Sequence, residues 1–345
     1  YALKYVNSEY TLDVKSLGLT DEDLSGMYQY TKDVATTQDG SKVLKGVSWQ
    51  ATPGLYAYRR SIAKDVLGTD DPAKVQEALA DWTKFDEVAA KAADKGYKML
   101  SGYDDAYRTF SNNVSAPWVN DNKEIIVDDN IMKWVDQTKT YTDKGYNNKT
   151  SLWSDAWAAD QGPDGKVFGF FYSTWGINFT LAGNSLAVKE KDGGKLEVGN
   201  GGYGDWAVCY GPQAYFWGGT WMAAAKGTDN AALVGDVLKA FCCDKDFGVQ
   251  FTKDTQDYYN NEAAMKELAS SDFKSAFLGG QNHIALFVET APMSKISVYD
   301  QGLNETFQAK FKEYFDGTVD KDTALKNFYE AAIVKYPELK KPANA

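Results

Sequence analysis

Histidine and cysteine are scarce in this 345-residue chain, which holds one of the former and three of the latter. The single His283 leaves no room for a histidine-based metal site. Cys209, Cys242 and Cys243 are an odd number and form no disulfide framework, although the sequence leaves open whether Cys209 pairs with one of the other two. We therefore expect neither a metal nor a cofactor.

Long apolar runs are also missing, and basic residues are in the minority. No stretch is long and apolar enough to span a bilayer, and no charged segment followed by an apolar one opens the chain. Acidic residues outnumber basic ones by 48 to 37, which gives a formal net charge of -11. Nucleic acid and anionic membrane surfaces both require clustered lysine and arginine, so neither is an expected partner.

Motifs for covalent catalysis are absent as well. The chain has no G-x-S-x-G nucleophile elbow and no G-x-x-x-x-G-K-S/T phosphate loop. Paired carboxylates can hydrolyse glycosides, and four pairs are candidates: Asp104 with Asp105, Asp128 with Asp129, Asp155 with Asp160, and Asp254 with Asp257. Most acids in an acidic protein are solvated surface groups, so we predict that the protein is not an enzyme.

Aromatic residues, in contrast, are abundant: 22 Tyr, 17 Phe and 10 Trp form 14% of the chain. A hydrophobic core alone rarely needs so many tryptophans. Aromatic rings also offer a large contact area at low entropic cost, which makes them common on recognition surfaces. The excess therefore favours a binding protein.

The chain is long enough for two domains. Apolar residues recur at helical spacing in residues 81–93, 230–243, 263–277, 304–315 and 324–336. Short β-rich runs occupy residues 43–48, 55–58, 98–100, 167–171, 206–209 and 220–224. This alternation predicts an α/β fold with mainly parallel sheets. Because no long linker divides the chain, we expect it to cross between the domains several times.

Several aromatic residues stand beside polar ones near the ends of predicted strands. These clusters are Trp49-Gln50, Tyr103-Asp104-Asp105, Tyr172-Ser173-Thr174-Trp175, Trp217-Gly218-Gly219-Thr220-Trp221, and the amide pair Gln281-Asn282 after two glycines. Sugars bind to such mixtures, because their C–H faces stack on rings while their hydroxyls pair with amides and carboxylates. Packing is the commoner role of any single tryptophan. Five clusters at strand ends favour a ligand site, since open α/β sheets bind ligands there.

Four segments, in this order, resemble the extracellular solute-binding proteins of carbohydrate ABC importers, the group that contains the maltose-binding protein. They are GVSWQATPGLYAYRRSIAKDVLG, DDPAKVQEALADWTKFDEVAAKAADKG, DGKVFGFFYSTWGINF and YGPQAYFWGGTWMAAAKGTDNAALVGDVLKAFC. The nearest likeness is to the oligosaccharide-binding lipoproteins of Gram-positive bacteria. Family members have a strand, a helix and a second strand before the segment that matches Tyr1, so we expect the N-terminal part of the first lobe to be missing from this chain.

The resemblance implies a type II periplasmic-binding-protein-like α/β fold with two lobes, several hinge crossings and a ligand cleft between the lobes. It places residues 1–58 and 211–256 in lobe 1, and residues 60–208 and 258–345 in lobe 2. By position, Trp175 is the first candidate for stacking on sugar, followed by Trp217. Arg59 lies near the first hinge crossing, where it would either bond a sugar hydroxyl or tie the lobes together.

The function implied is capture of a carbohydrate, an oligosaccharide rather than a monosaccharide, outside the cell. Hinge closure on the sugar would present the loaded protein to the membrane permease of an ABC importer. We expect a monomer that is lipid-anchored or periplasmic, whose signal peptide and anchor lie outside this chain. The alternatives are a secreted glycoside hydrolase and a polysaccharide-adhesion module.

Overall fold

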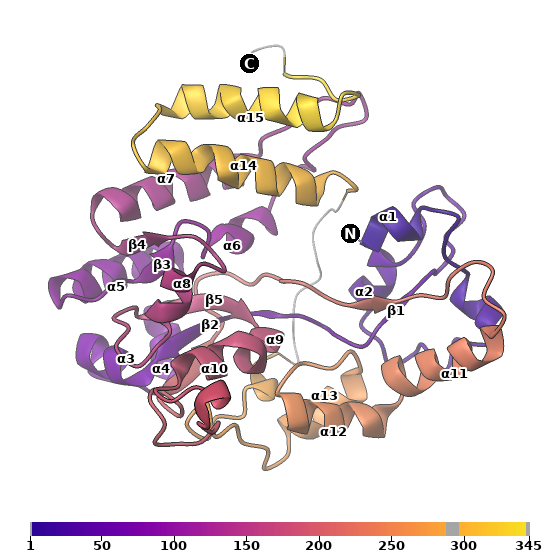
Figure 1. Cartoon of the computed structure of the whole chain (residues 1–345), viewed down its shortest axis with the longest axis horizontal. Coiled ribbons are helices and arrows are strands. Elements are labelled where there is room, and N and C mark those ends of the chain that lie inside the picture. The colour runs from indigo at the N-terminus through magenta and orange to yellow at the C-terminus, as the bar shows by residue number, and fades with distance from the viewer. Residues whose placement is uncertain (1, 288–296, 343–345) are drawn as a thin grey trace. The chain divides into compact units, whose positions relative to one another are not determined.

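The computed structural model describes residues 2–287 and 297–342 (Figure 1). The chain forms two compact units. Unit 1 consists of Tyr1–Ala57, Tyr172–Tyr210 and Phe216–Pro292, and unit 2 of Tyr58–Phe171, Gly211–Tyr215 and Met293–Ala345. Each unit is thus built from three separate stretches of chain.

Unit 1 contains mostly short elements with three longer helices near its C-terminal end. Its helices are α1 (Ala2–Val6), η1 (Val14–Leu17), α2 (Gln29–Val34), α9 (Thr174–Gly176), η2 (Ile177–Leu181), α10 (Ala182–Ser185), η3 (Glu190–Asp192), α11 (Ala231–Cys242), α12 (Lys245–Thr255), α13 (Glu262–Ala269) and η4 (Ile284–Leu286). Strands β1 (Val47–Ser48) and β7 (Trp221–Met222) pair antiparallel, with Val47 opposite Met222.

One core of unit 1 packs α11 against the N-terminal segments. Its buried residues are Val14, Leu17, Leu19, Leu24, Met27, Val47, Ala224, Leu238 and Cys242. Cys242 thus packs as a small hydrophobic side chain, and burial raises the pKa of its thiol to about 12. Cys209, Cys242 and Cys243, which all lie in the described ranges, form no disulfide, and this answers the open question of their pairing.

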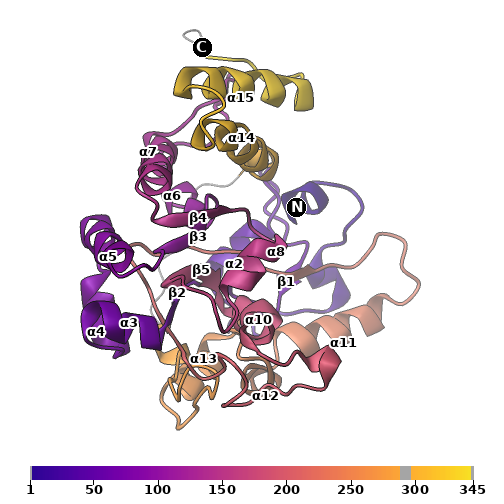
Figure 2. The same ribbon diagram turned by 60° about the vertical axis from the view of Figure 1, so that its left-hand side comes forward.

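Unit 2 contains long helices around a small parallel sheet. Its helices are α3 (Arg60–Leu67), α4 (Pro72–Ala78), α5 (Trp82–Asp94), α6 (Tyr107–Ser111), α7 (Asp129–Asp143), α8 (Asp155–Asp160), α14 (Asp300–Phe315) and α15 (Lys321–Lys335). Strands β3 (Leu100–Gly102) and β4 (Asn147–Thr150) pair in parallel. Helices α14 and α15 pack along each other beside α7 (Figure 2).

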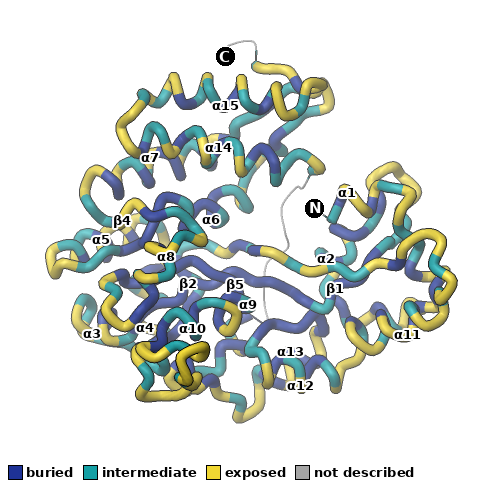
Figure 3. The backbone as a smooth tube through the Cα atoms, viewed as in Figure 1, coloured by how far each residue is buried: buried dark blue, intermediate teal, exposed yellow. Residues whose placement is uncertain are grey.

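Strands β2 and β5 of a three-stranded sheet, in the order β5-β2-β6, each contain a point where the chain passes from one unit to the other. Its strands are β2 (Gly54–Arg59), β5 (Gly169–Ser173) and β6 (Trp206–Cys209). Every residue of the three strands is buried (Figure 3). Strands buried on both faces read as continuous apolar runs, which is why the sequence located them well.

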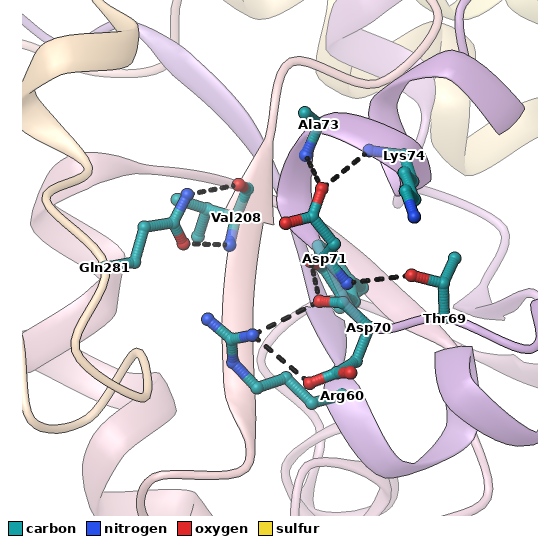
Figure 4. A network of polar contacts seen from close by, with 9 residues as sticks. Arg60, Thr69, Asp70, Asp71, Ala73, Lys74, Val208 and Gln281 are labelled. Atoms are coloured by element: carbon teal, nitrogen blue, oxygen red, sulfur yellow. Dashed lines mark hydrogen bonds and ion pairs between the residues drawn. The ribbon is translucent and has the colours of Figure 1, made fainter.

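Most predicted elements are confirmed, and the deviations have local causes. Asp81 caps α5 by accepting a hydrogen bond from the Lys84 amide, and Asp71 caps α4 through the Ala73 and Lys74 amides (Figure 4). The predicted helix over 263–277 ends at Ala269, because the Ser270 and Ser271 hydroxyls bond the last helical carbonyls. The sheets are not mainly parallel in unit 1, where β1 and β7 run antiparallel.

The division of the chain differs from the predicted lobes in three places. Residues 172–208 belong to unit 1 and not with 60–171. Residues 258–292 also belong to unit 1, and residues 211–215 belong to unit 2. The first difference matters for function, because it places Tyr172 and Trp175 in the same unit as Trp217 and Gly218.

Candidate ligand-binding site

Three of the predicted residues, Tyr172, Trp175 and Trp217, lie together in unit 1 and are called the aromatic platform below. Tyr172 is the penultimate residue of β5, and Trp175 lies in α9, which begins directly after that strand. The Trp217 ring stacks on the Tyr172 ring with centroids 6.0 Å apart and meets the Trp175 ring edge-on at 5.2 Å. Trp217 is 9% exposed and Tyr172 is fully buried, whereas Trp175 is half-buried. Of the three residues of the platform, Trp175 is therefore the most exposed to solvent.

A hydrogen bond and a glycine fix the orientation of Trp175. Its indole Nε1 donates to the Trp217 carbonyl oxygen at 2.7 Å. The next residue, Gly218, has a φ of +99°, and a Cβ there would lie 3.1 Å from the same indole nitrogen. Only glycine combines this left-handed backbone with so close an approach. The predicted approach of the Gly218 backbone to a ligand stays a prediction.

Phe179 extends the platform and was not predicted. Its side chain is 75% exposed, and its ring meets the Trp175 ring edge-on at 5.9 Å. It lies in η2, a π-helical turn, and such turns occur often at functional sites. The signal for it was available in the sequence, because Trp175 and Phe179 are four residues apart at the start of a helical segment.

A buried polar cluster adjoins the platform in the same unit. The Asp257 carboxylate accepts hydrogen bonds from the Thr174 hydroxyl at 2.8 Å and from the Gln50 side-chain amide. The Thr220 hydroxyl in turn donates to Gln50 Oε1 at 3.0 Å. Gln50, Thr174 and Asp257 are buried, and Thr220 is exposed. Of these four, only Gln50 was among the predicted site residues.

Three other predicted residues of unit 1 lie in packing positions. The Trp49 ring meets those of Phe251 at 4.9 Å and Phe241 at 6.2 Å, next to the core under α11. The Gln281 side chain pairs with both the amide and the carbonyl of Val208 in β6 (Figure 4). Asn282 Nδ2 donates to the Leu268 carbonyl near the end of α13. The structure does not bring these residues to the aromatic platform.

Tyr103, Asp104 and Asp105 follow β3 in unit 2, as the sequence indicated. Tyr103 is buried, stacks on Phe315 and donates its hydroxyl to Asp316. Asp105 is 4% exposed and accepts from the Ser101 and Gly102 amides and from the Trp157 indole. Asp104 is half-buried, accepts from the Leu152 amide at 3.2 Å, and its pKa is raised by burial. Asp104 is the most accessible of the three.

Trp153 gives unit 2 an exposed aromatic ring that was not predicted. Its side chain is 54% exposed, and its ring meets the buried Trp157 ring edge-on at 5.3 Å. Its backbone has a φ of +68°, which is unfavourable for a large side chain. It follows β4 just as Asp104 follows β3, so both lie beyond the carboxyl ends of a pair of parallel strands. Such ends are common ligand sites in α/β folds.

Asp105 makes a testable contribution to the pH dependence of stability. Burial raises its pKa to about 7, well above the value of about 3.9 in an unfolded chain. Its stabilising contribution is therefore fully present below pH ~4 and is lost as the pH rises through 7. The variant Asp105→Asn lacks this titration. Relative to the variant, the wild type should therefore lose on the order of 3 kcal/mol of unfolding free energy between pH 4 and pH 7.5. Urea unfolding at both pH values measures it, and a constant difference would show that the buried carboxyl is ionised throughout.

Arg59 is buried at 4% exposure and holds a loop of unit 2. Its Nη1 donates to the carbonyls of Pro163 and Gly165, and its Nη2 to those of Gln161 and Gly162, at 2.7–3.3 Å. The guanidinium thus converges on four backbone oxygens. This geometry favours a structural role over a bond to a sugar hydroxyl.

The described residues include no group of three or more His, Cys, Asp or Glu side chains arranged to hold a metal ion. None of the helices in the described ranges combines the length and apolarity needed to cross a membrane. Three of the predicted acid pairs include a buried member that serves the backbone or a side-chain network: Asp105, Asp128 and Asp257.

Comparison with known proteins defines the class. The family model of bacterial extracellular solute-binding proteins matches residues 1–282, and the chain belongs to this family. No curated protein matches the sequence. Among solved structures, an extracellular solute-binding protein of family 1 is 17% identical with a TM-score of 0.78, and the match covers 96% of this chain and 82% of the other.

Two further similar structures were solved in complex with a ligand. A binding protein associated with an ABC transporter of B. animalis subsp. lactis, in complex with beta-1,6-galactobiose, has a TM-score of 0.72 at 14% identity, with coverage of 99% of this chain and 84% of the other. The GacH receptor of Streptomyces glaucescens, solved unliganded and with acarbose, has a TM-score of 0.69 at 14% identity, with coverage of 98% and 82%. These likenesses establish the two-lobed binding-protein fold.

Proposed function

We propose that this solute-binding protein captures a neutral carbohydrate, an oligosaccharide in particular, outside the cell and delivers it to the permease of an ABC importer. The observation that carries the proposal is the half-buried Trp175, fixed by a 2.7 Å hydrogen bond and flanked by the exposed Phe179. Similar folds bind beta-1,6-galactobiose and acarbose, which supports the assignment of ligand class.

The chemistry of the site suits a sugar ring. The Trp175 face offers an apolar surface for the axial C–H groups, and Phe179 lengthens that surface toward a second ring. The exposed Gly218 and Thr220 bring a backbone and a hydroxyl beside it for sugar hydroxyls. In unit 2, Trp153 and Asp104 form a second pairing of an exposed ring with a polar group. The predicted closure of the protein on its ligand stays a prediction, which small-angle scattering with and without sugar would test.

A thermal-shift screen against mono- and oligosaccharides tests the proposal directly. A ligand that binds only the folded protein raises the melting temperature by mass action, worth about 2.7 kcal/mol at a hundred times its Kd. We expect a rise with one class of oligosaccharide, confirmed by titration calorimetry, and none with a non-sugar polyol at equal concentration. A folded protein that responds to no sugar would contradict the proposal.

The same samples test the hydrolase alternative. Members of the family are binding proteins, and we propose that this chain likewise lacks hydrolytic activity. A labelled oligosaccharide that stabilises the protein should remain intact after prolonged incubation. We also propose a monomer that is held at the cell surface or in the periplasm, which mass photometry and cell fractionation would examine.

A further inference from the structure

Two chain segments carry the aromatic platform and its neighbours, and they meet in two places. Tyr172, Thr174 and Trp175 belong to the first segment, and Trp217 and Thr220 to the second. At the platform itself they are joined by the 2.7 Å hydrogen bond from Trp175 to the Trp217 carbonyl. The Trp217 ring also contacts the rings of Tyr172 and Trp175, and the Ser48 hydroxyl donates to the Thr220 carbonyl at 2.8 Å. The second joining point adds a polar link to these packing contacts.

The second joining point is Asp257. Its Oδ1 accepts the Thr174 hydroxyl at 2.8 Å, which fixes the first segment. Its Oδ2 accepts the Gln50 side-chain amide, and Gln50 Oε1 accepts the Thr220 hydroxyl at 3.0 Å, which fixes the second. The two segments, Asp257 and Gln50 therefore form a closed ring of contacts around the base of Trp175.

Asp257 is itself held in one orientation. The residue is 4% exposed, and the Tyr258 amide donates to its Oδ1 at 2.7 Å. Its hydrogen-bond partners in the described part of the chain are all neutral. Tyr30 is the titratable neighbour, and its pKa is raised by burial first and also by the charge of Asp257. Burial raises the pKa of Asp257 to about 6.

We propose that Asp257 is a positioning residue for sugar binding, whose ionised carboxylate holds the Thr174 and Thr220 segments at the spacing in which Trp175 accepts a sugar ring. The proposal rests on the proposed function. Asp257 does not itself meet the ligand, since it is buried, and it acts through Thr174 and Gln50.

The donor and acceptor groups of this network predict what happens when Asp257 loses its charge. A carboxylate oxygen accepts, whereas a protonated oxygen or an asparagine amide in the same place donates. Facing a donor at Oδ2, Gln50 must turn its own oxygen toward Asp257 and its amide nitrogen toward Thr220, whose hydroxyl then accepts instead of donating. Protonation and Asp257→Asn therefore both replace the charge-assisted hydrogen bonds of the carboxylate by weaker neutral ones, while the bond from Trp175 to Trp217 remains. Sugar affinity should fall as the pH falls through about 6, because the carboxyl becomes protonated.

Calorimetric titration with the sugar found by thermal shift tests this at pH 7.5 and pH 5. We expect wild type to bind about fivefold more weakly at pH 5, because neutral hydrogen bonds to the protonated carboxyl hold the Thr174 and Thr220 segments less firmly than charge-assisted ones do. Asp257→Asn should show the weaker affinity at both pH values. The matched control is Asn261→Ala, which removes a buried cap of α13 in the same unit and should keep the wild-type pH dependence. A pH dependence that survives in Asp257→Asn would overturn the proposal.

A second measurement needs no sugar, so that failure of the proposed function and failure of this inference are distinguishable. In protein labelled with 5-fluorotryptophan, the Trp175 signal is assigned by its loss in Trp175→Phe. We expect that fluorine resonance to shift in the ligand-free wild type with a midpoint near pH 6 and to stay constant in Asp257→Asn. A wild-type resonance that does not move between pH 5 and 7.5 would refute the positioning role, even in a protein that binds sugar.

Discussion

Replacing Trp175 with alanine is expected to weaken sugar binding by about 2–4 kcal/mol, or roughly thirtyfold to a thousandfold. The substitution removes the largest solvent-facing ring of the aromatic platform and also the donor of the 2.7 Å bond to Trp217. Titration calorimetry with the sugar identified by thermal shift measures the loss. The unfolding free energy should change much less, because Trp175 is only half-buried.

Trp49→Phe is the matched control for this experiment. Trp49 is also half-buried and lies in the same unit, but its ring packs against Phe241 and Phe251. Its replacement should leave sugar affinity unchanged. If Trp49→Phe lost affinity and Trp175→Ala did not, the ligand site would lie on the Trp49 side of unit 1, and the platform would be a packing feature.

Arg59→Ala is expected to lower the unfolding free energy by about 3 kcal/mol or more. The substitution removes the buried guanidinium, which donates hydrogen bonds to four backbone carbonyls, those of residues 161, 162, 163 and 165. Arg59→Lys should recover only part of the loss, because an ammonium group has three donors and lacks the planar fork. Urea unfolding measures both variants.

The neighbouring arginine supplies the control. Arg60 pairs with Asp70 at 3.4 Å in a partly exposed position, and Arg60→Ala should cost less than about 1 kcal/mol. Sugar affinity decides between the two roles predicted for Arg59. An Arg59→Ala protein that stays stable but loses its affinity would establish that the guanidinium bonds the ligand.

Much of the fold could be predicted because its strongest signals are periodic. Residues 81–93 show an apolar helical stripe behind Asp81, and α5 spans Trp82–Asp94 with Asp81 as its cap. The buried strands β2, β5 and β6 also lie within two residues of their predicted positions. The assignment of chain segments to units was harder, because both units contain helices and strands. Nothing in the sequence of a helix or strand shows in which of the two units it packs.

The candidate site was predictable only in part. Trp175, Trp217 and Gly218 were found because an aromatic or glycine pair after a strand is conspicuous in sequence. Asp257 was considered as a possible catalytic acid, since nothing local indicates that its partners are residues 50 and 174. Trp153 was missed because exposure of a single aromatic residue in a loop depends on the surrounding packing. Phe179 was missed although its spacing of four residues from Trp175 was a signal, because that spacing does not show which side chain is exposed.

The order in which the units are assembled along the chain has a consequence for biosynthesis. Val14 and Val47 share a hydrophobic core with Leu238 and Cys242 of α11, so this core stays incomplete until α11 has been made. At ordinary translation rates that interval is on the order of ten to forty seconds. The N-terminal segments cannot complete their fold during this time, however stable the finished protein is. Until α11 has been made, the apolar residues of these segments therefore stay exposed and prone to aggregation.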